Sequence, residues 1–177
     1  MIDEIVQSLR LKFDGAIKEV ITFKGETTLL IRTESIVEVC KALKEEHGFN
    51  YCADICGADR FTEEERFEVI YNLTNLDKHL RLRLKVRVEE DNPVVPSVTS
   101  VWKGANWHER ETYDMYGIRF DGHPDLRRMY MPEDFEYYPL RKDFPLIGVP
   151  GSIPLPELDE RAQNKHAAER FNSGERI

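Results

Sequence analysis

The residues of this chain that could do chemistry gather between positions 108 and 123. The residue types there that ligate metals or transfer protons are His108, Glu109, Glu111 and His123. His108-Glu109 begins like the zinc-protease helix signature, which needs a second histidine four residues after the first. Threonine stands at position 112, so that ligand is missing. A free-standing metal-dependent enzyme stays a distant alternative, and we expect no catalytic residue and no bound metal.

The cysteines and the glycine patterns point to no cofactor held by this chain. Cys40, Cys52 and Cys56 cannot supply the four thiolates of a usual iron–sulfur cluster or structural zinc site. They are best explained as small buried side chains that stay reduced in the cytosol. The chain has no Walker loop, no dinucleotide fingerprint and no nucleophile elbow. We therefore expect it to bind no nucleotide or flavin.

Glu109 is the unusual residue of a helix that we expect to begin at Pro96-Ser97, with Ser97 as N-cap, and to end at Gly117. It interrupts an apolar stripe, and a carboxylate there must be protonated or find a cation and hydrogen bonds. Our hypothesis is that it pairs with Arg127 or Arg128 and folds the following segment back onto the helix. The same spacing predicts that Glu111 and Asp114 are solvated, and the turn Gly122-His123-Pro124 favours a structural histidine.

The elements that position these residues follow from periodicity. Residues 3–13 have helical spacing, and residues 17–23 and 27–32 predict a hairpin. Ser35 and Glu38 have capping-box spacing for a second helix that ends at His47-Gly48. Residues 66–73 and 79–88 alternate in polarity and predict an antiparallel hairpin, whereas 51–59 is taken as a short connection. The fold class is α+β, a two-layer domain with a mostly antiparallel or mixed sheet packed by helices.

One face of the segment 79–88 is basic and could suggest a phosphate or nucleic acid site. Its cations are Arg81, Arg83, Lys85 and Arg87. Glu68 and the acidic residues 63–65 can neutralise them across strands or turns. The net charge of −8 also repels polyanions. A nucleic acid module therefore remains only an alternative.

Composition places the chain among globular proteins. It has 177 residues, of which 41% are hydrophobic and 33% charged, a size suited to one domain with an appendage. No apolar run approaches the roughly 20 residues that cross a bilayer, and the N-terminus lacks the basic start of a secretory signal. We expect a cytosolic protein.

The segment 139–156 combines prolines with large apolar side chains, namely Phe144, Leu146, Ile147, Val149, Ile153 and Leu155. Proline forbids helix and central strand there, yet a flexible linker should be polar. The segment either wraps over its own domain or lies in a groove on another protein. We divide the chain into a domain at 1–124 and an extended docking segment at 125–177, with a possible terminal helix at 157–171.

Three sequence blocks carry a resemblance to a known family. They are ANWHERETYDMYG at 105–117, GHPDLRR at 122–128 and PLRKDFPL at 139–146. The chain resembles the thirty-kilodalton (C) subunit of respiratory complex I, the NADH:quinone oxidoreductase. Tyr137 and Tyr138 stand where many members have Gly-His.

The resemblance implies a non-catalytic component of the hydrophilic arm that docks on the forty-nine-kilodalton (D) subunit, on the cytoplasmic side of the inner membrane. FMN, iron–sulfur clusters and quinone would belong to partner subunits. The runner-up is the equivalent subunit of a membrane-bound hydrogenase or cofactor F420 dehydrogenase.

By resemblance, some residues organise the helix end and others face the partner. The structural motif comprises Glu109, Arg110, Glu111, Asp114, Gly117, Gly122, His123 and Pro124. The partner interface comprises Arg127, Arg128, Pro139, Leu140, Arg141, Lys142, Asp143, Phe144, Pro145 and Leu146.

Overall fold

The computed structural model describes residues 2–61, 63–145 and 148. Its elements in chain order are α1 (Ile2–Lys12), β1 (Ile17–Phe23), β2 (Glu26–Ile31), η1 (Thr33–Ser35), α2 (Ile36–Glu45), β3 (Tyr51–Asp59), β4 (Phe67–Asn75), β5 (Leu80–Val88), β6 (Val94–Pro96), α3 (Ala105–Tyr116) and β7 (Arg119–Asp121). Among the described helices, none combines the length and apolar character that a bilayer crossing requires.

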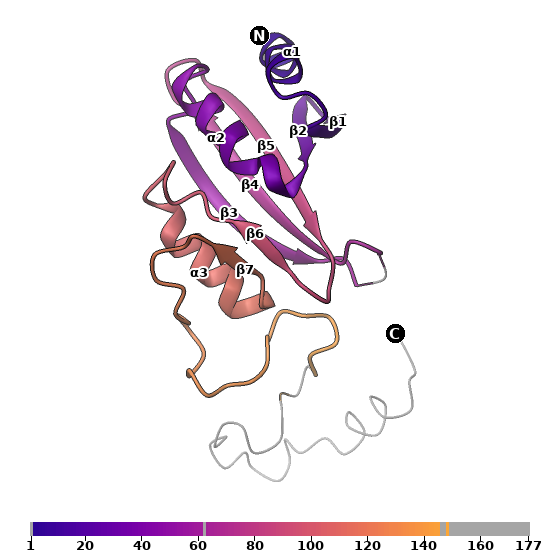
Figure 1. Cartoon of the computed structure of the whole chain (residues 1–177), viewed down its shortest axis with the longest axis vertical. Helices are drawn as coiled ribbons and strands as arrows, with labels where there is room; N and C mark the ends of the chain where they lie inside the picture. The colour runs from indigo at the N-terminus through magenta and orange to yellow at the C-terminus, as the bar shows by residue number, and fades with distance from the viewer. Residues whose placement is uncertain (1, 62, 146–147, 149–177) are drawn as a thin grey trace. The chain divides into compact units, whose positions relative to one another are not determined.

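A five-stranded sheet forms the centre of the domain, in the order β1-β2-β5-β4-β3 (Figure 1). The pairs β1–β2, β4–β5 and β3–β4 are antiparallel, while β2 and β5 run parallel and join the two groups of strands. β6 and β7 form a separate parallel pair. This mixed sheet packed by helices confirms the predicted α+β class.

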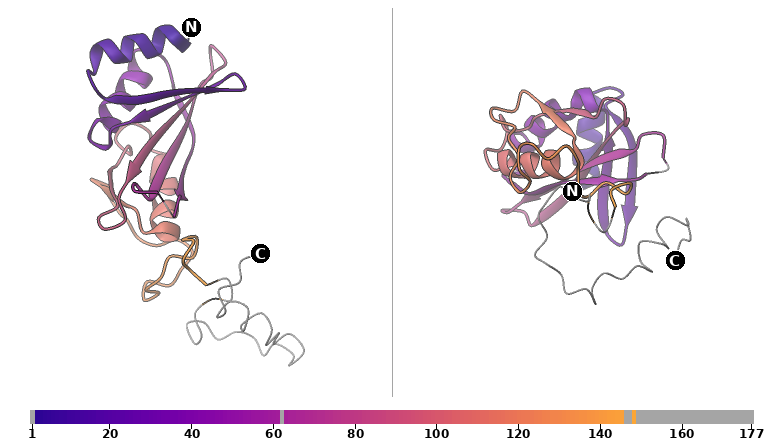
Figure 2. Two further views of the ribbon diagram at one scale, coloured as in Figure 1. Left: turned by 90° about the vertical axis from the view of Figure 1, so that its right-hand side faces the viewer. Right: turned by 90° about the horizontal axis from the view of Figure 1, so that it is seen from below.

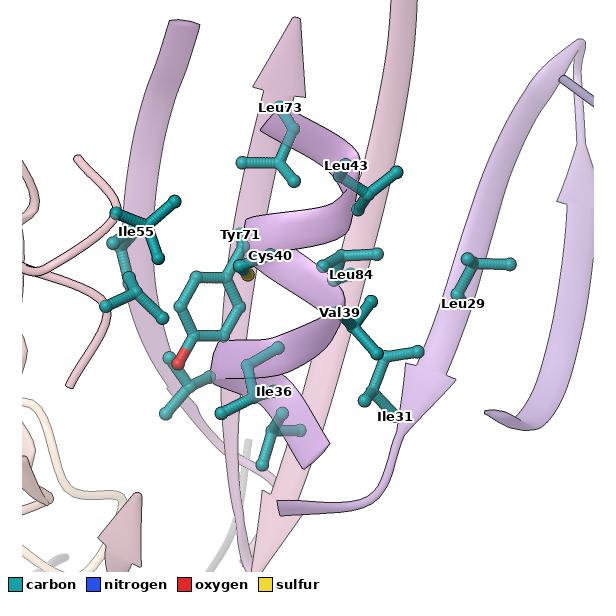
Figure 3. Close-up of a cluster of buried hydrophobic side chains, with 14 of the residues drawn as sticks. Leu29, Ile31, Ile36, Val39, Cys40, Leu43, Ile55, Tyr71, Leu73 and Leu84 are labelled. Atoms are coloured by element: carbon teal, nitrogen blue, oxygen red, sulfur yellow. The ribbon is translucent and has the colours of Figure 1, made fainter. Parts of the chain in front are cut away.

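The apolar side chains of β4 and β5 alternate as predicted and form the floor of the core. On β5, Leu82, Leu84, Val86 and Val88 are at most 8% exposed. The buried face of α2 packs on them through Ile36, Val39, Cys40 and Leu43, and Figure 3 shows these residues beside Tyr71, Leu73 and Leu84. α1 lies alongside the β1–β2 hairpin and closes that end of the core with Ile5, Val6 and Leu9 (Figure 2).

The third helix, α3, covers β3 on the same face of the sheet as α2. Gly57 pairs with Val69, whose side chain belongs to the core, so the missing side chain of Gly57 would point to that face. A Cβ atom at Gly57 would lie 2.5 Å from Tyr116 and 3.0 Å from Thr112 of α3. Glycine therefore permits the close approach of α3 to the edge strand.

Three predictions about the elements were wrong. Residues 51–59 form the edge strand β3 rather than a connection; a bulge between Cys52 and Asp54 removes the alternation that would have indicated it. The third helix begins at Ala105 rather than near Ser97, because residues 94–96 pair with β7 and the Ser97 N–H donates to the Asp121 carbonyl at 2.7 Å. Ser35 ends η1 and its side chain makes no capping hydrogen bond.

The described residues up to Phe144 form one compact unit, and a second unit starts at Pro145. Nearly all of the second unit lies outside the described residues, including Leu146, the other apolar residues expected beyond it and the possible helix at 157–171. The division predicted after residue 124 stays a prediction.

Candidate docking site at helix α3

Asp114 organises the segment that follows β7. Its Oδ2 accepts hydrogen bonds from the N–H groups of Met129, Tyr130 and Met131 at 2.9, 2.6 and 3.1 Å, and its Oδ1 accepts one from Arg128 at 3.0 Å. Burial alone would raise the pKa of Asp114, but these donors together lower it. The prediction that Asp114 is solvated was wrong, because the segment folds over it and leaves it fully buried.

We call residues 125–144 the strap. Arg110 holds its first part from the exposed side of α3. The Arg110 guanidinium donates to the carbonyls of Arg127 and Arg128 at 3.0 and 3.2 Å and lies over the Trp107 ring, 5.2 Å from its centre. Glu111 is exposed, as predicted. The helix therefore holds the strap through two neighbouring turns, with Arg110 binding carbonyls and Asp114 binding amides.

Glu109 does not pair with Arg127 or Arg128, so that hypothesis was wrong. Its buried carboxylate accepts hydrogen bonds from the Ser97 hydroxyl at 2.7 Å and the Val98 N–H at 2.8 Å. Burial raises its pKa to about 7, because these two bonds only partly offset the loss of water. Glu109 thus fastens α3 to the loop after β6.

The buried side chain of His123 lies beside Glu109 of α3. Its Nε2 lies 3.2 Å from the Asn106 carbonyl oxygen and 3.9 Å from the Glu109 carboxylate, and its Nδ1 accepts a hydrogen bond from the Asp125 N–H at 3.0 Å. The side chain is fully covered. Both ring nitrogens contact backbone groups, an arrangement that fixes the turn between β7 and the strap.

The C-terminal end of α3 holds the last part of the strap. Gly117 adopts φ 77°, which ends the helix in the left-handed conformation. The Leu140 N–H donates to the Met115 carbonyl at 3.1 Å, and Arg141 donates to the Tyr116 carbonyl at 2.7 Å. These bonds satisfy carbonyls that a helix end leaves free, and the Arg141 cation lies where the helix dipole favours it.

A third anchor joins the strap to the end of the sheet. Asp59 and Arg66 form a buried bidentate pair at 2.9 and 2.7 Å. The Lys142 N–H donates to Asp59 at 2.7 Å, and the Asp143 carboxylate reaches Arg66 at 3.1 Å. Burial alone would raise the pKa of Asp59, but the donors lower it to about 2. The sequence did not indicate this anchor, because nothing near Asp59 or Arg66 points to the strap, more than 70 positions away.

Aromatic rings from two parts of the strap pack against each other. The Phe135 ring lies 5.6 Å from the Tyr137 ring and 6.2 Å from the Phe144 ring. Phe135 is 8% exposed, whereas Tyr130, Tyr137 and Leu140 are 59%, 44% and 51% exposed. The strap therefore has a small core of its own and still presents large apolar side chains to solvent.

The described residues expected to face a partner divide into three groups. Arg128, Arg141 and Asp143 hold the strap on its own domain through the bonds described above. Arg127 pairs locally with Asp125 at 2.8 Å, and Leu140 and Lys142 are exposed. The half-buried members are Pro139, Phe144 and Pro145. Leu146 lies outside the described residues, and the assignment of all these residues to a partner interface stays a prediction.

No cluster of three metal-ligating side chains occurs within the part of the chain that the structure describes. Cys40 lies in the core, and burial raises the pKa of its thiol; burial also raises the pKa of Cys52 and Cys56, to about 12 and about 11. These thiols are therefore protonated near neutral pH and poorly suited to ligate a metal.

Comparisons with known proteins agree with the fold and the motif blocks. Residues 29–150 match the family described as the respiratory-chain NADH dehydrogenase 30 kDa subunit. The NADH-quinone oxidoreductase C 2 subunit of Rhizobium etli is 52% identical over 139 residues, which cover 77% of this chain and 74% of that protein. The C subunit of the same enzyme from Roseiflexus sp. is 47% identical over 144 residues, or 80% and 83% of the two chains.

Two solved structures are also similar. The trypsin-resistant fragment (1–134) of Nqo5 has a TM-score of 0.62 and 34% identity, covering 71% of this chain and 98% of the fragment. A chain of the membrane-bound sulfane sulfur reductase, an archaeal respiratory membrane complex, has a TM-score of 0.70 and 20% identity over 99% of this chain and 94% of that one, a likeness in fold alone. The family match, the relatives and the fold together show that this chain belongs to the family of the 30 kDa subunit of respiratory-chain NADH dehydrogenase.

Proposed function

We propose that this chain is a non-catalytic structural component of the hydrophilic arm of a proton-translocating NADH:quinone oxidoreductase. It docks through the strap and the residues that follow it onto the forty-nine-kilodalton subunit of the same complex. It lies peripherally on the cytoplasmic side of the membrane. FMN, the iron–sulfur clusters and quinone are held by partner subunits, and electrons pass through those subunits rather than through this chain.

The observation that carries the proposal is the strap, which is fixed at three places while several of its large apolar side chains stay exposed. Anchors at Asp114, at the end of α3 and at Asp59 leave Tyr130 and Leu140 more than half exposed. Side chains already held in position lose little entropy on binding, and exposed aromatic residues are common energetic centres of interfaces. A segment built in this way is suited to docking on another protein.

The function follows from the family and the strap together. The curated relatives are named as subunits of NADH-quinone oxidoreductase, so this chain is proposed to serve the same assembly. Asp114 and Asp59, the buried carboxylates that contact the strap, hold backbone N–H groups and arginine side chains in place. This use favours a structural role over a catalytic one.

Affinity purification of the tagged native chain from solubilised membranes tests the proposal. We expect a homologue of the forty-nine-kilodalton subunit in stoichiometric amount, together with subunits that carry flavin and iron. Co-purification of a nickel-binding subunit instead would identify the related hydrogenase type of assembly. Recovery of the chain without any partner would contradict the docking role.

A further inference from the structure

The face of the sheet opposite α2 and α3 carries a groove that the strap does not use. Strand register places Arg81, Thr74 and Tyr51 in one row across β5, β4 and β3, and Arg83 beside Asn72 in the next. Over these rows lies a hollow of about 380 Å³. We call it the open-face groove; the lining residues that matter here are Glu26, Tyr51, Asn72, Leu76, Arg81 and Arg83.

The charge of the groove is not balanced. Arg83 donates to Glu26 at 2.8 Å and to Asn72 at 3.2 Å, whereas the Arg81 side chain makes no ion pair or hydrogen bond with any described residue. The charged residues that line the groove are two arginines and one glutamate, so one positive charge is left over. The groove therefore offers an unpaired guanidinium in a chain whose total charge is −8.

Farther along β5, the other basic side chains on this face are neutralised by a buried glutamate, and Arg81 differs from them in this respect. Lys85 and Arg87 both bind Glu68, at 2.6 and 3.0 Å, and these three side chains are largely covered. Burial alone would raise the pKa of Glu68, yet the two cations lower it, so it stays ionised. Glu68 thus neutralises Lys85 and Arg87, as expected for this face, but does not pair with Arg81.

The rim of the groove is apolar. Tyr51 is 50% exposed and Leu76 is 52% exposed, and both lie on the lining of the groove. Tyrosine and arginine are enriched where proteins bind one another. A ligand that fits must therefore bring a negative group for Arg81 and an apolar group for the rim.

We propose that the open-face groove binds an acidic segment of a second neighbouring protein of the same assembly. An aspartate or glutamate of that segment accepts hydrogen bonds from Arg81, and an adjoining apolar side chain packs on Tyr51 and Leu76. The proposal rests on the proposed function in one respect, since the partner belongs to that complex. Nucleic acid fits less well, because one free arginine neutralises one phosphate while the chain as a whole repels polyanions.

A photo-crosslinker tests this in the intact complex. We place p-benzoylphenylalanine at position 51 of the tagged chain, irradiate the purified complex and identify the adduct by mass spectrometry. The expected adduct is a peptide of a co-purifying protein with an aspartate or glutamate next to the attachment point. Arg81→Glu should lower its yield about tenfold, as loss of a charge pair at an interface does. Arg81→Gln, which adds no repulsion, should lower it less.

The matched control is Arg10→Glu, which reverses an exposed arginine on α1 and should leave the yield unchanged. A second probe at position 140 reports on the strap. A cross-link from position 140 without one from position 51 overturns the groove proposal and leaves the docking of the strap intact. An adduct with nucleic acid, or a yield that Arg81→Glu does not change, overturns it as well. A chain that purifies alone overturns both proposals.

Discussion

Three buried carboxylates, those of Asp114, Asp59 and Glu109, offset the cost of burial in different ways. Asp114 and Asp59 each accept several N–H groups and an arginine, and their pKa values fall below the usual range. Glu109 accepts only two hydrogen bonds, and its pKa rises to about 7. The first two are therefore ionised anchors at neutral pH, whereas Glu109 changes charge within the physiological range.

Glu109 makes the stability of the domain depend on pH near neutrality. Because its pKa is about 7 in the folded chain and near 4.5 in the unfolded chain, the folded state binds the proton more tightly. The stability gained from this tighter proton binding is complete below about pH 4.5. It is lost as pH rises to 7, and the free energy of unfolding falls by up to about 1.4 kcal/mol for each pH unit. Glu109→Gln keeps groups that can hydrogen-bond to Ser97 and Val98 but cannot ionise. It should therefore remove the slope of the free energy of unfolding against pH in this range. Urea unfolding between pH 5 and 8 measures it.

Glu111→Gln is the matched control, since it removes an exposed carboxylate from the same helix. It should keep the slope of the parent chain. The same slope in Glu109→Gln as in the parent would show that Glu109 does not titrate in this range. Asp59 does not interfere with the comparison, because its contribution is lost only as pH falls from about 4 toward 2.

Glu109 could be recognised as unusual from the sequence, but its partners could not. An acid on an apolar stripe must find hydrogen bonds, and that much follows from burial alone. The sequence predicts Ser97 as the N-cap of the helix and suggests Arg127 or Arg128 as the partner of Glu109. Once α3 begins at Ala105, the loop at Ser97 is free to donate to Glu109, and Arg128 is left for Asp114. The wrong helix start thus hid the loop at Ser97 as the partner of Glu109.

At the level of elements, the alternation of β5 made that strand predictable, whereas β3 was missed. β5 alternates because one face meets α2 and the other meets solvent or Glu68. β3 lies at the edge, is bulged and contains Gly57, so its sequence carries no clear period of two. The strap has no period at all, because side chains of α3 and β3, together with Arg66 before β4, hold it.

Leu84→Ala tests the core between β5 and α2. Leu84 is 0% exposed at the centre of the sheet, so truncation leaves a cavity that the surrounding strands cannot fill. We expect the free energy of unfolding to fall by roughly 2 to 5 kcal/mol. Leu76→Ala, at a position 52% exposed, is the control and should change it little. Equal effects of the two substitutions in urea unfolding would contradict the assignment of Leu84 to the buried face of β5.

Asp59→Asn tests the third anchor of the strap. The change weakens the bidentate pair with Arg66 and the acceptor of the Lys142 N–H, so stability should fall by about 3 kcal/mol. Trypsin should then cut faster after Arg141 and Lys142, because the backbone there is no longer held. Mass spectrometry of timed digests measures the rate. Asp125→Asn changes an exposed carboxylate of the same strap, and unchanged rates in both variants would refute the anchor.

At the scale of the whole molecule, the proposed docking through the strap predicts that assembly can be lost while the fold is kept. Tyr130→Asp combined with Leu140→Asp replaces two exposed side chains, while the anchors on α3 use only the backbone N–H groups of these residues. The isolated chain should keep its unfolding midpoint, and its recovery in the membrane complex should drop sharply. Quantitative mass spectrometry of the purified complex gives the readout.

Leu11→Asp is the control for that experiment, because Leu11 is 88% exposed on α1 and far from the strap in sequence. Normal incorporation of the double variant would contradict docking through the strap. Phe144 is a less suitable site for such a change, since its ring packs against Phe135 and Tyr137 within the domain.

A very close contact between α3 and the sheet occurs over Gly57, where a Cβ atom would lie 2.5 Å from Tyr116. Any larger residue there would force the Tyr116 and Thr112 side chains to move, on the same helix that carries Asp114 and the carbonyls that receive Leu140 and Arg141. The seat of the strap on α3 thus depends on a side chain that the sequence omits at Gly57.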